Sequence, residues 1–121
     1  MAYLLDLPTF TDPRGSLTVL DNIIPFEIKR VYYIYNASAK RGGHRHKKNI
    51  QCLIALQGSC EIFVNNGREK KVFVLDNPSK GLILETVDWH TMDNFKNNCI
   101  LLVLASEHYD KNDYIDEEYP S

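Results

Sequence analysis

Short runs of alternating apolar and polar residues, separated by turn-forming residues, extend over most of this 121-residue chain. Because successive strand side chains point to opposite faces, such alternation is typical of half-buried β-strands. No stretch keeps apolar residues at helical spacing over three turns, so we expect no long helix. Asn65, Asn66 and Gly67 form a strong hairpin signal, since Asn and Gly tolerate positive φ. The predicted strands cover residues 16–21, 29–36, 50–56, 60–64, 71–75, 82–84 and 100–105. This pattern predicts an all-β sandwich or small barrel.

Length and composition indicate one globular domain over residues 1–121, with 44% hydrophobic residues to form its core. The net charge of −2 gives no general attraction to nucleic acid or to an anionic membrane, so we expect neither partner. The first residues contain no basic region and no long apolar run, which predicts neither a signal peptide nor a membrane span. Three cysteines without a CxxC pair are typical of reduced thiols, and we expect a cytoplasmic protein.

His44 and His46 carry the clearest chemical signal in the sequence. One residue separates them, so on a strand both side chains point to the same face. Two imidazoles directed at one cavity indicate either a metal site or proton transfer near neutral pH. The spacing alone leaves both possibilities open.

His44, His46, Gln51 and Gly58 together resemble the first signature motif of the cupin superfamily, in which a His-x-His pair is followed by Glu and then Gly. The spacing agrees, with four residues between His46 and Gln51 and six between Gln51 and Gly58. The second cupin signature is only partly present around His90. The resemblance implies a double-stranded β-helix (jelly roll) as a single domain, which agrees with the predicted strands.

Gln51 stands where cupins usually have a metal-binding glutamate. A neutral amide is a much poorer ligand for a divalent ion than a carboxylate. A three-histidine metal site formed by His44, His46 and His90 remains open as an alternative. The missing carboxylate favours a metal-free site, and we expect no metal and no other cofactor.

A longer series of motifs resembles the cupin-type sugar-nucleotide 3,4-ketoisomerases. The series comprises residues 30–35, 41–51, 56–59, 75–82, 89–90, 102–106 and 109–115. The resemblance implies an isomerase that moves the ketone of dTDP-4-keto-6-deoxy-D-glucose from C4 to C3 in deoxyamino-sugar biosynthesis. The net reaction is an internal oxidation and reduction, so it needs no nicotinamide.

This reaction requires a base that removes the C3 proton, groups that stabilise the enediolate, and return of a proton to C4. The family motif implies His44 as the base, and His46 would orient the sugar or transfer a second proton. Tyr33 and Tyr35 share one face of a predicted strand. Either phenol is a candidate for passing a proton between the two sugar oxygens. We expect the intervening Tyr32 to pack or to face outward.

Five further residues are candidates for binding the substrate. Arg41 is expected to hold the enediolate or a phosphate. Arg14 is a second candidate for the diphosphate, because guanidinium pairs with phosphate oxygens bidentately. The alternative is that Arg14 is a solvated turn residue. Gln51 is expected to hydrogen-bond a sugar oxygen. His90 is expected to bind the substrate, with orientation of its neighbours through a hydrogen bond to Asn94 as the alternative. Trp89 is expected in the core or the pocket wall, with stacking on the thymine ring as an alternative.

Three other functions remain open from the sequence. The motif at residues 12–17 also resembles the 3,5-epimerases that act on the same type of substrate. A non-catalytic sugar-nucleotide-binding cupin and a metal-dependent cupin enzyme are the other two. Small cupins of this kind are commonly dimers that exchange N-terminal strands, so we expect a homodimer, and the apolar Tyr3, Leu4 and Leu5 are candidates for crossing over.

Overall fold

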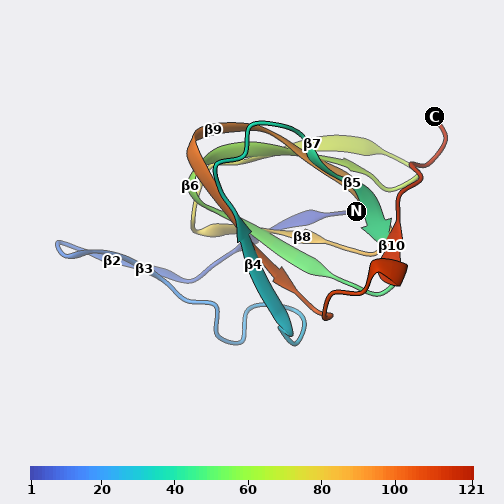
Figure 1. The fold of residues 1–121 in the computed structure, drawn as a ribbon. Helices are drawn as coiled ribbons and strands as arrows, with labels where there is room; N and C mark the ends of the chain where they lie inside the picture. The colour runs from blue at the N-terminus through green and yellow to red at the C-terminus, as the bar shows by residue number, and fades with distance from the viewer.

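The computed structural model describes residues 1–121 and consists almost entirely of β-strands (Figure 1). The strands are β1 (Tyr3–Asp6), β2 (Thr9–Asp12), β3 (Gly15–Thr18), β4 (Arg30–Ile34), β5 (Arg41–His46), β6 (Gln51–Asn65), β7 (Lys70–Leu75), β8 (Lys80–Leu84), β9 (Trp89–Ala105) and β10 (Tyr114–Ile115). One short 3₁₀ helix, η1 (Lys111–Asp113), precedes β10. The predicted all-β class is confirmed. No helix of the structure has the length and apolar character needed to span a membrane.

The strands curl into two layers that share their two central strands. The first half of β6 and the second half of β9 pair with β8 and β4, and β1 extends this layer beyond β8. The other halves of β6 and β9 pair with β7 and β5, and β10 extends the second layer beyond β5. All of these pairings are antiparallel.

A corner in β6 and β9 lets each strand pass from one layer to the other. The strands are 15 and 17 residues long, and their register shifts near the middle. Gly58 lies at the corner with a φ of 67°, and a Cβ there would collide with the carbonyl oxygens of Lys96 and Asn97. Asn97 and Asn98 also have positive φ, which Asn tolerates better than most residues. The sequence predicted separate strands at 50–56 and 60–64; the structure joins them because the chain bends here without leaving the sheet.

The hydrophobic core lies between the two layers. Leu53 and Leu101 come from the first layer and Ile62 from the second, and all three are fully buried in one cluster. His46 and His90 are buried as well, at 4% and 1% exposure. The inside of the jelly roll therefore has an apolar part and a polar part.

The β2–β3 hairpin projects away from the body of the molecule and pairs with no other strand (Figure 1). Phe10 and Leu17 lie opposite each other on it and are 64% and 63% exposed. Strand β4 pairs only with β9, so its other edge is open. Strand β1, which contains the segment expected to cross to a partner, instead pairs with β8 of its own chain.

Candidate active site

A β-bulge at Gly42 and Gly43 sets the direction of the side chains in β5. Both glycines have positive φ, 84° and 85°, and a Cβ on Gly42 would lie 3.0 Å from the carbonyl oxygen of His90. The register with β9 shifts at the bulge, so Arg41 and His44 both lie opposite buried residues of β9. Directly opposed residues share a face of a sheet. Arg41 and His44 are three positions apart, so they would lie on opposite faces of a regular strand. The bulge brings both side chains to the inner face.

Three imidazoles meet inside the jelly roll. The ring centroid of His44 lies 5.1 Å from that of His46 and 5.1 Å from that of His90, and 6.3 Å separates His46 from His90. Tyr114 of β10 packs edge-on against both His44 and His46, at 4.6 Å in each case. As the alternation predicted, His44 and His46 share a face, and β9 places His90 beside them.

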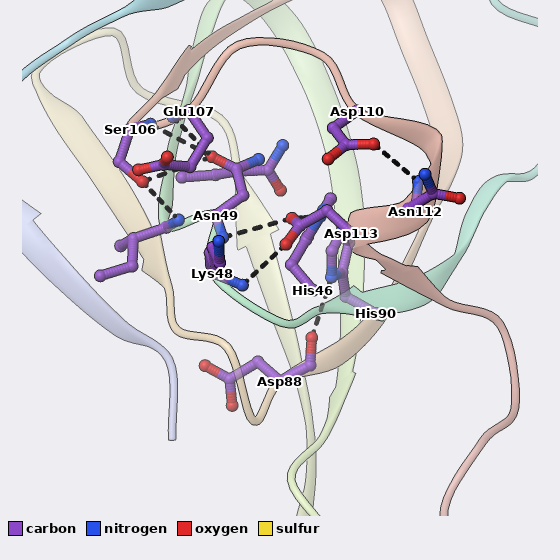
Figure 2. A network of polar contacts seen from close by, with 12 residues as sticks. His46, Lys48, Asn49, Asp88, His90, Ser106, Glu107, Asp110, Asn112 and Asp113 are labelled. Carbon is purple, nitrogen blue, oxygen red and sulfur yellow. Dashed lines mark hydrogen bonds and ion pairs between the residues drawn. The ribbon is translucent and has the colours of Figure 1, made fainter.

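Asp113 fixes the orientation of His46 (Figure 2). Its Oδ2 atom lies 3.0 Å from Nδ1 of His46, and its carboxylate also accepts hydrogen bonds from the backbone N–H groups of Lys48 and Asn49. The η1 helix positions this carboxylate: Asp110 caps the helix, and β10 follows it directly and pairs with β5. A buried carboxylate with three donors is well satisfied, so His46 is held in one orientation.

The hydrogen bonds of His46 and His90 leave an acceptor nitrogen free on each ring. Nδ1 of His46 donates to Asp113, and Nδ1 of His90 lies 3.0 Å from the backbone carbonyl of Asp88, which can only accept. In the neutral rings, Nε2 is then unprotonated, and both Nε2 atoms are buried without a partner, as is Oε1 of Gln51. Buried polar atoms are nearly always paired in native proteins, so these atoms indicate a place for a ligand or water.

Burial keeps all three imidazoles neutral near pH 7. It lowers the pKa of His44 to about 4 and that of His90 to about 3. The pKa of His46 is also lowered by burial, although the hydrogen bond to Asp113 acts in the opposite direction. Neutral imidazoles accept protons, which is the state a general base requires.

Tyr32 of β4 faces the interior and contacts Gln51. Nε2 of Gln51 donates to the hydroxyl of Tyr32 over 3.2 Å, and this fixes both side chains. Burial raises the pKa of Tyr32 above that of a free phenol, so it is protonated at neutral pH. Gln51 occupies the position at which many cupins have a metal ligand, and in this chain its side chain hydrogen-bonds Tyr32.

Tyr33 and Tyr35 do not lie with the histidines, contrary to the sequence prediction. They are 62% and 61% exposed and contact each other on the outer face, with ring centroids 5.8 Å apart. Tyr32 is the tyrosine of this strand that faces inward, although it was expected to pack or face out. The alternation correctly placed Tyr33 and Tyr35 on one face, but it carries no information on which face is inside.

Arg14 and Trp89 are also separated from the imidazoles within this chain. Arg14 lies at the tip of the projecting hairpin, 91% exposed and paired with Asp12 at 2.6 Å. Trp89 precedes the inward-facing His90 and lies on the outer side of the sheet, in a cavity of about 380 Å³ beside Phe63. Of the expected binding residues, Arg41, Gln51 and His90 are the ones that the structure brings to the inner face.

Tyr32, Asp113 and Tyr114 belong to the site but were not predicted from the sequence as functional residues. Asp113 comes from a segment 67 residues after His46, and no local pattern shows that this acidic tail returns to β5. The only available signal was the motif at 109–115, which contributed to the family resemblance but implied no role. The structure contains no group of three or more His, Cys, Asp or Glu side chains arranged to hold a metal ion.

Solved structures with the same fold process nucleotide-linked sugars. A 3,4-ketoisomerase from Helicobacter canadensis is 44% identical with a TM-score of 0.91, covering 96% of this chain and 90% of that one. A His-to-Asn mutant of the 3,4-ketoisomerase QdtA from Thermoanaerobacterium thermosaccharolyticum, solved with TDP-4-keto-6-deoxyglucose, is 42% identical with a TM-score of 0.92, covering 96% and 87%. The dTDP-4-dehydrorhamnose 3,5-epimerase from Bacillus anthracis, at 18% identity and a TM-score of 0.80 over 93% and 76%, shares the fold alone. The predicted jelly roll is confirmed, and fold and site together define a cupin-type sugar-nucleotide isomerase.

A match to a sequence family shows more closely which kind of isomerase the chain resembles. Residues 2–120 match the family described as "FdtA: WxcM-like, C-terminal". The TDP-4-oxo-6-deoxy-alpha-D-glucose-3,4-oxoisomerase of Aneurinibacillus thermoaerophilus is 40% identical over an alignment of 116 positions that covers 93% of this chain and 84% of that protein. The chain belongs to the FdtA family of sugar 3,4-ketoisomerases, as its motifs predicted.

Proposed function

We propose that this protein moves the ketone of TDP-4-keto-6-deoxyglucose from C4 to C3. The observation that carries the proposal is the cluster of three neutral imidazoles, in which the Nε2 atoms of His46 and His90 are unpaired, in a chain 40% identical to an oxoisomerase of this sugar. A relative at 42% identity was solved with the same sugar nucleotide. Imidazole nitrogens that can accept and return a proton suit the transfer of protons between adjacent sugar carbons.

His44 is the least buried of the three imidazoles, and we assign it as the base. It removes the C3 proton, which the adjacent ketone acidifies, and the C–H electron pair forms the double bond of an enediolate with its charge on O4. A proton then returns to C4 through the His44 and His46 pair. Tyr32, rather than Tyr33 or Tyr35, moves the hydroxyl proton from O3 to O4, which leaves the ketone at C3.

The experiment is incubation of the purified protein with TDP-4-keto-6-deoxyglucose in D2O, followed by NMR. The expected result is a 3-keto product with deuterium at C4 and recovered substrate with deuterium at C3. Tight binding without either change would support a non-catalytic binding cupin, and deuterium at C5 would support a 3,5-epimerase. The proposed chemistry uses no metal, so activity should be insensitive to a chelator and elemental analysis should find no stoichiometric metal.

We also propose that the protein is a homodimer in which the β2–β3 hairpin of each chain lies on the partner. The hairpin has no strand partner within its own chain, and its Phe10 and Leu17 are exposed. The open edge of β4 offers such a hairpin hydrogen bonds, and the exposed Val31 and Tyr33 on β4 and Tyr35 just after it offer apolar contacts. In this arrangement Arg14 at the hairpin tip would act on the partner's substrate.

We also propose that the protein is located in the cytoplasm. Cys52, Cys60 and Cys99 are all free and buried, as expected for thiols in a reducing compartment.

A further inference from the structure

Arg30, at the start of β4, carries a positive charge that no carboxylate neutralises. None of the ion pairs in the structure includes it. Its guanidinium carbon lies 4.4 Å from the ring centroid of Tyr32 and 5.4 Å from that of Tyr109. Contact with aromatic faces holds a guanidinium in place without cancelling its charge. The half-buried Arg30 is therefore a fixed cation with free donors.

This cation belongs to the wall that contains the reacting groups. It stacks on Tyr32, whose hydroxyl is bonded to Gln51. Its charge also reaches His46, where it acts with burial to lower the pKa of the imidazole. The titratable groups around His46 are otherwise Asp113 from η1, His44 from β5, His90 from β9 and Tyr114 from β10.

We propose that Arg30 is a catalytic residue that contacts the enediolate oxygen and stabilises its negative charge. The inference rests on the proposed function, in which removal of the C3 proton creates that charge. The three imidazoles are neutral in the resting enzyme, so the only positive charge they supply is the one that His44 gains with the C3 proton. A preorganised cation in a partly buried site interacts with developing charge more strongly than it would in water. Arg41, exposed at the rim of the same face, is the better placed of the two for the diphosphate.

The test compares Arg30→Gln and Arg30→Lys with the wild type, and uses Arg68→Gln on the exposed β6–β7 turn as a matched control. Arg30→Gln should lower kcat about 100-fold, the usual cost of removing one oxyanion-stabilising group. It should leave the dissociation constant for TDP, measured by calorimetry, within about twofold of the wild type, a difference of about 0.4 kcal/mol. Arg30→Lys should recover part of kcat, because the charge is kept while the planar stacking is lost. Arg68→Gln should match the wild type.

A second readout does not depend on the reaction. Titration of the His46 ring by NMR should show a higher pKa in Arg30→Gln than in the wild type, with Arg30→Lys between them. An unchanged kcat in Arg30→Gln, or a large loss of TDP binding with kcat retained, would overturn the proposal. If the wild-type protein itself has no isomerase activity, the proposed function fails instead, and the titration still shows whether Arg30 acts on the imidazoles. If Arg30→Gln does not fold, Arg30→Lys alone tests the catalytic role of Arg30. A wild-type kcat in Arg30→Lys together with weakened TDP binding would contradict that role.

Discussion

At the scale of single residues, the site depends on which tyrosine of β4 faces inward. The strand alternation predicted that Tyr33 and Tyr35 share a face, and they do, but that face is the outer one. Tyr32 points the other way and is bonded to Gln51. Strand alternation divides residues between two faces but does not show which face is buried. Residues 32, 33 and 35 are all tyrosine, so hydrophobicity does not distinguish the buried one.

This difference gives a matched pair of variants. Tyr32→Phe should lower kcat by at least about 100-fold, because general acid–base catalysis by one group contributes at least that much. Tyr33→Phe removes the same hydroxyl from the neighbouring residue and should retain wild-type kcat. Steady-state kinetics on both proteins, after circular dichroism shows that both are folded, measures the effect. Equal losses in the two variants would show that Tyr32 has no special role.

At the scale of elements, the irregular positions of the strands build the site. The sequence correctly predicted most of the strands from alternation and turn residues. It did not predict that β6 and β9 continue through a corner. Glycine and asparagine, which occupy positions 58 and 98 at this corner, are also common in turns that end strands. The bulge in β5 was also unpredictable, since it depends on close contact between Gly42 and the backbone of β9, which is remote in sequence.

The role of the close backbone contact at the bulge can be tested with Gly42 and Gly43, two neighbouring glycines that have nearly the same φ. Gly42→Ala would add a Cβ 3.0 Å from the carbonyl oxygen of His90, whereas Gly43→Ala would meet only a Trp89 ring atom at 3.9 Å. Both variants should lose about 1 kcal/mol or more of unfolding free energy because of the positive φ. Gly42→Ala should lose more, and its kcat should fall further because His44 is displaced. Urea unfolding and kinetics measure both effects; a Gly43→Ala variant that is equally impaired would contradict the role of the close contact.

At the scale of the whole molecule, the projecting β2–β3 hairpin is the element that pairs with no other strand of its own chain. Phe10→Glu together with Leu17→Glu should convert the proposed dimer to a monomer, because two charges would replace the exposed apolar pair. Thr11→Glu adds a charge at a position of the same hairpin that points to its other face, and it is the control. Size-exclusion chromatography with light scattering gives the mass. A monomeric wild-type protein would contradict the dimer proposal.

The neutral imidazoles also couple the stability of the molecule to pH. The folded pKa values of His44 and His90, about 4 and about 3, lie below the unfolded value of 6.5. Between about pH 6.5 and 4 the unfolded chain therefore binds more protons than the folded one, and the free energy of unfolding should fall as the pH falls. It should be nearly constant just above pH 7. Urea unfolding over a series of pH values measures this dependence, and His44→Asn should reduce its slope; a protein that is equally stable across the acidic interval would contradict the burial of neutral histidines.

His44 is proposed to remove the C3 proton of the substrate, and hydrogen exchange at that carbon in the His44→Asn variant tests this role. Asparagine retains a polar side chain of similar reach but cannot act as a base near neutral pH. NMR in D2O should show that the variant binds TDP-4-keto-6-deoxyglucose and neither exchanges the C3 hydrogen nor forms the 3-keto sugar, while the wild type does both. Exchange and turnover close to wild type in His44→Asn would contradict this role.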